Sequence, residues 1–222
     1  MTIKKYLHSC ILIEENGKRL LIDPGLFSFI EGKLKPEDIG GVDVILITHK
    51  HADHYYPEAM KKILAQKVAL ILANEEVGAL LAKESSPHGE ILPYEEIKAG
   101  DTKNIAGFTI EALAAPHGQI PGETPQNLAF LINRRILHPG DSLDVKRASP
   151  GDVLFLPVVA PWLRLVDALG FADTLKPKKV IPIHDAIMKD FMLERIYAMC
   201  ANHFTKQGID FHSLQLEEKL EV

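Results

Sequence analysis

The chain has 222 residues, of which 46% are hydrophobic and 25% are charged. This is an ordinary globular composition, and a chain of this length buries roughly 70% of its surface on folding, which excludes a disordered, collagenous or coiled-coil protein. The formal net charge is −5, and no run of Lys or Arg is longer than two residues. The charge gives no electrostatic basis for binding nucleic acid or an anionic membrane. We therefore expect a small-molecule partner.

Targeting and redox features indicate a cytoplasmic protein. The chain has no apolar run of the 18 or more residues that a membrane helix needs. An apolar stretch over residues 6–13 contains His8 and Ser9 and lacks a small-residue cleavage site, so it does not match a signal peptide. Cys10 and Cys200 match no zinc-binding spacing, and we expect two buried thiols rather than a disulfide. The sequence leaves the oligomeric state open, and a homo-oligomer is compatible with it.

In chain order, the first half predicts three strands and then alternating strands and helices. Strands are expected over residues 3–7, 10–14 and 19–22, with a hairpin turn at Asn16-Gly17 between the last two. A continuous apolar run over 42–48 is typical of a buried strand; a helix over 56–66, a strand over 68–73 and a helix over 75–84 follow.

In the second half, strands again precede helices along the chain. Strands are expected over 108–115, 128–132, 136–138 and 153–159, then a helix over 163–174, a strand over 179–184, a helix over 188–206 and a short strand over 211–216. No linker separates the halves. We therefore predict one domain over residues 1–222, an α/β (α+β) protein in which two mixed sheets pack face to face with helices outside, a four-layer αββα sandwich.

The residues that follow the buried run 42–48 have the composition of a metal site. His49, His51, Asp53 and His54 lie within six residues, where the strand is expected to end. Imidazole and carboxylate are ligands that Zn²⁺, Mn²⁺ and Fe²⁺ all accept. A solvated polar loop is the alternative, but it gives no reason for three imidazoles and a carboxylate to leave a core strand together. The pattern predicts a metal-binding loop.

The sequence Thr-His-x-His-x-Asp-His, present here as Thr48 to His54, resembles the hallmark of the metallo-β-lactamase superfamily. Three downstream motifs resemble those of the same family in the same order: Ala115-Pro116-His117-Gly118, Pro139-Gly140-Asp141-Ser142 and Ile181-Pro182-Ile183-His184. Leu21-Ile22-Asp23-Pro24-Gly25 is similar to the family's early Asp-containing turn, so the resemblance spans roughly residues 3–215. It implies the αββα sandwich with a metal site at one edge of the paired sheets.

Carried over residue by residue, the resemblance implies two metal ions. One would lie on His49, His51 and His117, and the other on Asp53, His54 and His184, with Asp141 as the bridge. Two divalent ions, Zn²⁺ first with Mn²⁺ or Fe²⁺ as alternatives, would activate a water for attack near neutral pH. Some true β-lactamases use a cysteine ligand where this chain has Asp141, and this favours other hydrolase branches over antibiotic destruction.

Residues 152–159, Pro161-Trp162 and residues 176–184 resemble the short single-domain branch that contains L-ascorbate-6-phosphate lactonase. The resemblance implies a metal-dependent hydrolase that cleaves an ester-like bond: a lactone, a phosphodiester or a thioester. The phosphate-binding residues of the lactonase have no match here, and no basic insertion supplies the arm of the tRNA-processing branch. A di-iron oxidoreductase on the same fold is an alternative, although the chain has no flavin module. A metal-binding module without catalysis is another, although all seven ligands are present.

Catalytic roles beyond metal binding are expected for two residues. Asp53 would align the attacking water, and His8, expected at the end of the first strand, would face the cleft as a proton donor from outside the coordination shell. A packed histidine bonded to backbone is the alternative for His8. Asp23 is expected to support the metal loop by accepting backbone N–H bonds, and Trp162 either lines the mouth or caps the core. The loop over 119–126 is expected to border the mouth, because it directly follows a ligand.

Overall fold

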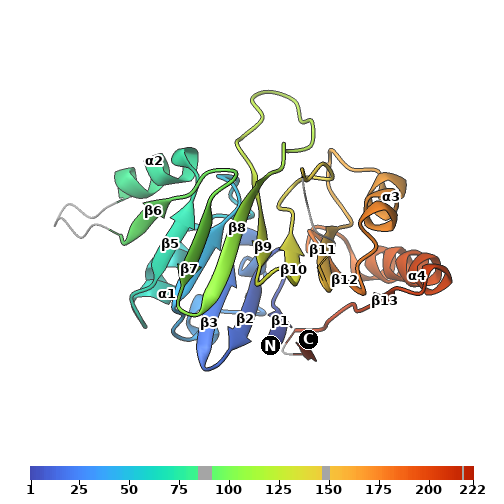
Figure 1. Ribbon diagram of the computed structural model, residues 1–222, viewed down its shortest axis with the longest axis horizontal. Helices are drawn as coiled ribbons and strands as arrows, with labels where there is room; N and C mark the ends of the chain where they lie inside the picture. The colour runs from blue at the N-terminus through green and yellow to red at the C-terminus, as the bar shows by residue number, and fades with distance from the viewer. Residues whose placement is uncertain (85–91, 147–150, 217) are drawn as a thin grey trace.

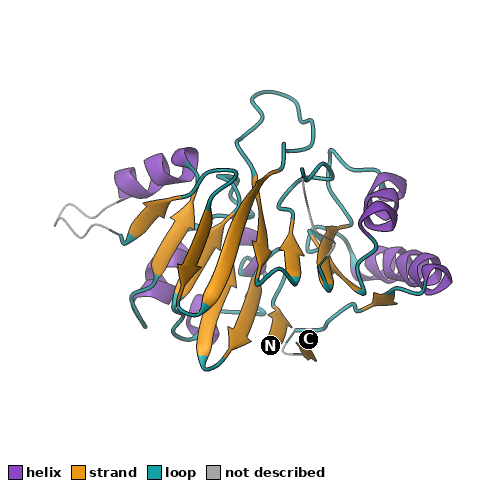
Figure 2. Ribbon diagram, in the orientation of Figure 1, coloured by secondary structure: helices purple, strands orange, loops and turns teal. Residues whose placement is uncertain are grey.

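The computed structural model describes residues 1–84, 92–146, 151–216 and 218–222, and the structural statements below refer to these residues. They form two seven-stranded sheets that pack face to face (Figure 1). Figure 2 shows the helices on the outer sides of the two sheets. The predicted fold class, an αββα sandwich of two mixed sheets, is confirmed.

The first sheet has the strand order β14-β1-β2-β3-β4-β5-β6. Its strands are β1 (Thr2–Lys5), β2 (Ile11–Glu15), β3 (Lys18–Ile22), β4 (Val44–Ile47), β5 (Leu70–Ala73), β6 (Tyr94–Glu96) and β14 (Lys219–Glu221). The strands from β14 to β3 pair antiparallel, and those from β3 to β6 pair parallel. The hairpin between β2 and β3 turns at Asn16 and Gly17, both at positive φ, as the sequence predicts.

The second sheet has the strand order β13-β12-β11-β10-β9-β8-β7. Its strands are β7 (Thr102–Ile105), β8 (Phe108–Ala114), β9 (Leu128–Ile132), β10 (Ile136–His138), β11 (Val153–Pro157), β12 (Lys179–Ile183) and β13 (Asp210–Phe211). The strands from β7 to β10 pair antiparallel, and those from β10 to β13 pair parallel.

Helices cover the outer face of each sheet. In the first sheet, apolar side chains pack against α1 (Pro57–Leu64) and α2 (Glu75–Glu84). The second sheet packs against α3 (Leu165–Leu175) and α4 (Asp190–Gln207). Two short 3-10 helices, η1 (Leu26–Ser28) and η2 (Pro36–Ile39), lie between β3 and β4. Over the described residues, no helix combines the length and apolarity that a membrane crossing requires.

Strand β4 shows why the run over 42–48 is apolar throughout. Val44 and Leu46 face the core between the sheets, where Phe155 of the second sheet also packs. Ile45 and Ile47 face the helices on the other side. A strand that is buried on both faces needs apolar residues at every position, so its sequence does not alternate. The strand brings the metal-binding motif to the edge of a rigid core.

The ends of several elements differ from the prediction. The first strand ends at Lys5 rather than at residue 7, because the Tyr6 N–H donates to the Cys10 carbonyl and the Cys10 N–H to the Leu7 carbonyl, which closes a turn. The predicted strand over 211–216 contributes only its first residue to β13. Strands β6, β7 and β14 were not predicted, because they are short and carry polar residues.

Candidate metal centre

Two parallel strands position the first metal-binding loop. Asp23 directly follows β3, and Thr48 directly follows β4, its parallel neighbour. One Asp23 oxygen accepts the Thr48 backbone N–H at 2.8 Å, and the other accepts the Thr48 hydroxyl at 2.7 Å. The expected support of the loop by Asp23 is confirmed. Asp23 also accepts a hydrogen bond from His54 Nδ1 at 2.7 Å, which the sequence analysis did not foresee.

A glycine lets a second loop pack directly on the metal-binding loop. A Cβ at Gly25 would lie 1.8 Å from the carbonyl oxygen of Asp53, so any larger residue would force the backbones apart. Beside it, the Leu26 N–H donates to the Ala52 carbonyl at 2.7 Å. The turn after β3 therefore supports the segment that carries Asp53 and His54.

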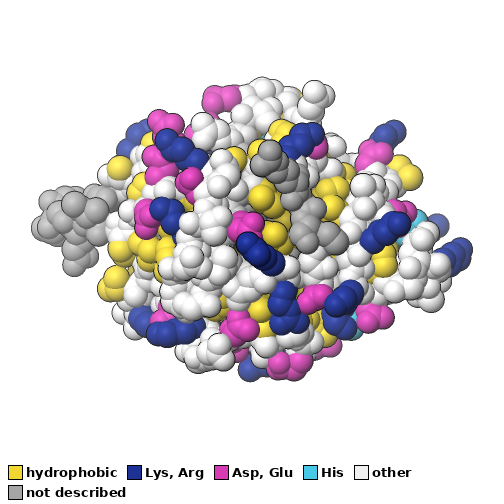
Figure 3. Space-filling view, viewed as in Figure 1, with side chains coloured by type: hydrophobic (Ala, Val, Ile, Leu, Met, Phe, Trp, Pro, Cys, Tyr) yellow, Lys and Arg dark blue, Asp and Glu magenta, His cyan; other side chains and the backbone are white. Residues whose placement is uncertain are grey.

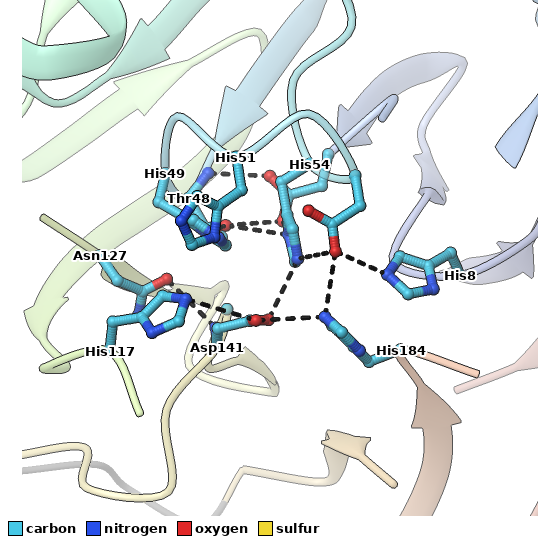
Figure 4. A network of polar contacts seen from close by, with 12 residues as sticks. His8, Thr48, His49, His51, His54, His117, Asn127, Asp141 and His184 are labelled. Carbon is cyan, nitrogen blue, oxygen red and sulfur yellow. Dashed lines mark hydrogen bonds and ion pairs between the residues drawn. The ribbon is translucent and has the colours of Figure 1, made fainter. Parts of the chain in front are cut away.

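The structure brings all seven predicted ligands together, from the loops after β4, β8, β10 and β12 (Figure 4). Three groups of side chains have candidate ligand atoms within 4.8 Å of one another: His49, His51 and His117; Asp53, His54 and His184, joined by His8; and His49, His54 and Asp141. The first two groups are the two sets that the resemblance implies, apart from the added His8. The third group connects them.

Asp141 lies between the two sets. Its Oδ1 is 3.1 Å from His54 Nε2, and its Oδ2 is 3.5 Å from His117 Nε2 and 3.1 Å from His184 Nε2. The carboxylate thus faces imidazoles from both sets, and this is the position that a bridging ligand requires.

The orientation of three imidazoles fits a divalent cation. His54 Nδ1 bonds to Asp23, His117 Nδ1 to the Gly118 carbonyl at 2.6 Å and His184 Nδ1 to the Val159 carbonyl at 2.5 Å. A proton held on Nδ1 by an oxygen leaves the Nε2 lone pair for a metal. All three Nε2 atoms, and Asp141 Oδ1, are buried and have no hydrogen-bond partner in the part of the chain that the structure describes. Buried lone pairs that face one another call for a cation between them.

The pKa shifts of the site also favour a bound cation. Burial lowers the pKa of His54, but the carboxylates of Asp141 and Asp23 outweigh it and hold that pKa well above its usual value. Burial also lowers the pKa of His184, and Asp141 and Asp53 raise it, to about 9. Although burial raises the pKa of Asp141, His54 and His184 hold it well below its usual range. The carboxylates therefore favour positive charge at this position, which a divalent ion bound between the side chains would supply.

His8 differs from the ligand candidates. It lies in the turn between β1 and β2, at φ 58°, and not at the end of a strand as predicted, because β1 ends three residues earlier. Its Nε2 is 3.2 Å from Asp53 Oδ2, and its Nδ1 is buried without a hydrogen-bond partner. The ring has 0% exposure and packs against Phe27 and His184. Burial lowers the pKa of His8 to about 4, so the ring is neutral.

Two further residues hold Asp141. Trp162, whose position the sequence left open between mouth and core, donates its indole N–H to Asp141 Oδ2 at 3.0 Å and packs against Gly118. Asn127 was missed by the sequence analysis: its Oδ1 accepts the Asp141 N–H at 3.2 Å, and its Nδ2 donates to two carbonyls. In the sequence, only its position directly after the loop over 119–126 could have indicated that Asn127 lies near the site.

The loop over 119–126 lies on the side of the candidate centre. Its Glu123 approaches Lys50 of the metal-binding loop at 3.5 Å, and the Gly118 N–H donates to the Asp141 carbonyl at 2.8 Å. In Figure 1 this loop rises above the ends of β8 and β9. It borders the site, as its direct connection to His117 predicts.

Comparisons with known proteins agree with this fold. A family model described as "Beta-lactamase superfamily domain" matches residues 2–184. Protein Rv0786c of Mycobacterium tuberculosis is 34% identical over 200 residues, which cover 85% of each chain. A UPF0173 metal-dependent hydrolase of Carboxydothermus hydrogenoformans is 28% identical over 192 residues, covering 80% of this chain and 81% of the relative. Igni18, a metallo hydrolase from Ignicoccus hospitalis, has the same fold, with a TM-score of 0.71 at 17% identity over 99% of this chain and 97% of its own.

Proposed function

The chain belongs to the metallo-β-lactamase superfamily, and from this we propose that it is a metal-dependent hydrolase of an ester-like bond in a small molecule. The observation that carries the proposal is the convergence of seven His and Asp side chains, three of whose Nε2 atoms are buried and have no hydrogen-bond partner among the described residues. Relatives that are named metal-dependent hydrolases support it. The proposed catalyst is one domain over residues 1–222, because both sheets contribute to a single inner core.

We propose that the centre holds two divalent ions. His49, His51 and His117 would bind one, and Asp53, His54 and His184 the other, with Asp141 between them. Zn²⁺ is the first candidate, and the same imidazole and carboxylate set also suits Mn²⁺ and Fe²⁺. When bound, such ions would polarise the scissile group and lower the pKa of a water molecule.

Side chains of the protein would accept the proton of the attacking water and return it to the leaving group. The Asp53 side chain is 17% exposed, and its Oδ2 lies 3.2 Å from both His8 Nε2 and His184 Nε2. An anionic carboxylate in this position can accept the proton of the attacking water and return it to the leaving group. Neutral His8 donates its Nε2–H to Asp53, which keeps the carboxylate oriented. Because the His8 ring has 0% exposure, we propose that it acts through Asp53 and does not touch the substrate.

The surroundings favour an uncharged substrate over a phosphorylated one. Lys50, in the metal-binding loop, is already paired with Glu76 at 3.3 Å and with Glu123 at 3.5 Å. A phosphate group would have to compete for this cation. We therefore propose a lactone or a thioester ahead of a phosphodiester, and the sequence similarity to the L-ascorbate-6-phosphate lactonase branch does not include that enzyme's phosphate contacts. We propose no nucleic-acid partner, because the net charge is −5 and no run of Lys or Arg exceeds two residues. Figure 3 shows basic and acidic side chains interspersed on the face in view.

The test combines metal analysis with a panel of lactones, thioesters and phosphodiesters. We expect about two divalent ions per chain and a hydrolytic activity that a chelator removes and added Zn²⁺ or Mn²⁺ restores. Iron-dependent oxygen consumption without hydrolysis would favour the di-iron oxidoreductase instead. Tight metal binding with no reaction on any member of the panel would favour a non-catalytic module.

A further inference from the structure

His184 and His8 have unusual backbones next to the candidate centre. Both lie in the left-handed region, at φ 61° and φ 58°. Residues other than glycine rarely adopt this conformation, and they keep it only where the surroundings hold them. The His184 N–H donates to the His8 carbonyl at 3.3 Å, and the ring centroids are 4.1 Å apart (Figure 4). The two histidines come from different sheets, so this contact joins the sheets beside the centre.

A network of three polar side chains, two of them buried and the third half-buried, lies directly behind these two residues. Lys5, the last residue of β1, forms an ion pair with Asp185, and both residues are 3% exposed. The Tyr197 hydroxyl, on α4, donates to Asp185 Oδ2 at 2.6 Å. Asp185 follows His184 in the chain, and Lys5 precedes His8 by three residues. The network therefore ties β1 and α4 to the loop that carries His184.

Stability alone does not explain this network. Taking two charges out of water costs free energy, and apolar residues of similar volume are often as stabilising as a buried ion pair. The ion pair between Lys5 and Asp185 instead fixes the position of the Asp185 backbone relative to β1. Partners that orient ligands in this way typically change metal affinity 10–100-fold when they are removed.

We infer that Lys5, Asp185 and Tyr197 form a positioning network for one half of the proposed metal centre, the half made by His184 and, through His8, by Asp53. The inference rests on the proposed function for the existence of that centre. The network holds the His184 backbone, the Val159 carbonyl holds its ring, and His8 in turn stays 3.2 Å from Asp53. His49 and His51 lie at the start of the loop after β4 and His117 lies after β8, and neither segment carries a member of the network, so the other half depends on other contacts.

The test is a Lys5→Met variant, which keeps an unbranched side chain one atom shorter and removes its charge. Co²⁺ affinity is measured by competition with a chelator, and the visible Co²⁺ spectrum reports the coordination. We expect one of the two bound equivalents to weaken about 10–100-fold with a changed spectrum, while the other equivalent keeps its affinity. Lys5→Arg, which keeps the cation, should restore much of the affinity. If Lys5→Met does not fold, Tyr197→Phe should weaken the same equivalent by a smaller factor.

A matched control comes from the same helix as Tyr197. Phe204 is fully buried on the outer face of the second sheet, and Phe204→Leu should lower stability without changing either Co²⁺ affinity. The inference is overturned if Lys5→Met binds both equivalents like the wild type, or if both weaken together. A wild-type chain that binds no divalent ion would overturn the proposed function and this inference together. Two bound ions without hydrolysis would overturn only the proposed function, because the affinities are measured without substrate.

Discussion

The Asp53 carboxylate lies within 4 Å of three imidazoles and is partly exposed to solvent, so a substitution there tests the chemistry without disturbing the hydrophobic core. We predict that Asp53→Asn lowers kcat about 10²–10⁴-fold, because the amide keeps the shape but loses both the anionic metal ligand and the proton acceptor. The far-ultraviolet circular dichroism spectrum should stay the same, since the side chain is not part of the hydrophobic core. Turnover at the wild-type rate on the best substrate of the panel would rule out the proposed role.

Asp23 controls which nitrogen of His54 faces the centre. Its Oδ2 accepts both the Thr48 hydroxyl and His54 Nδ1, at 2.7 Å each. In Asp23→Asn, an amide N–H that faces His54 would hold the proton on Nε2 and remove the lone pair from the metal side. We predict that metal affinity falls about 10–100-fold, measured by chelator competition.

The control for this prediction is Asp43→Asn. Asp43 accepts the Arg19 backbone N–H at 2.9 Å just before β4, at the end of the strand opposite Thr48. This contact also joins an Asp carboxylate to a backbone N–H, but it lies away from the candidate centre. Its loss should therefore leave metal affinity unchanged. Equal losses in the two variants would show that general loosening of the sheet, and not the state of His54, is responsible.

The seven ligand candidates could be named from the sequence because each sits in a short motif at a strand end. Trp162 and Asn127 are different: each reaches Asp141 from a distant loop, and the positions share no motif. The link between Asp185 and Lys5 spans 180 residues and could not be inferred from either end. Side-chain contacts of this kind depend on how two sheets register against each other, which local patterns do not encode.

At the scale of elements, the close contact between two loops at Gly25 is a structural requirement. In Gly25→Ala the new Cβ would meet the Asp53 carbonyl at 1.8 Å, so the metal-binding loop must move. We predict a loss of about 1–3 kcal/mol in the free energy of unfolding, measured by urea denaturation, with weaker metal binding.

The same substitution at Gly170 in α3 gives the opposite expectation. A Cβ there has no heavy atom within 4 Å, and alanine is a better helix former than glycine by up to about 1 kcal/mol. Gly170→Ala should therefore be neutral or stabilising and leave metal binding unchanged. If Gly25→Ala behaves like Gly170→Ala, the two loops are not as closely packed as the geometry requires.

Elements with a strong pattern were predictable, and those without one were not. The strands over 128–132 and 136–138 and the helix over 75–84 have the predicted bounds, since each combines apolar periodicity with clear flanking residues. Strands β6 and β14 have sequences Tyr-Glu-Glu and Lys-Leu-Glu, with no alternation to identify them. They lie at the two edges of the first sheet, where pairing on one side is enough to hold a polar strand.

At the scale of the whole molecule, the candidate centre connects the two sheets, because its ligand candidates come from loops of both. The loop after β4 belongs to the first sheet, and the loops after β8, β10 and β12 belong to the second. An ion that binds ligands from both sheets binds the folded chain far better than the unfolded one. Such an ion stabilises the fold by about 4 kcal/mol when its concentration is a thousand times its dissociation constant.

We predict that removing metal with a chelator lowers Tm by about 8–16 °C, because each kcal/mol shifts Tm by about 2–4 °C in a domain of this size. Differential scanning calorimetry of the stripped and metal-loaded chain measures the difference, and adding Zn²⁺ or Mn²⁺ back should restore it. The control is His117→Ala, in which one set of ligands is incomplete, so that metal addition should recover only part of the shift. If Tm does not change when metal is removed and restored, the protein core alone holds the ligands of the two sheets together, and metal binding does not stabilise the fold.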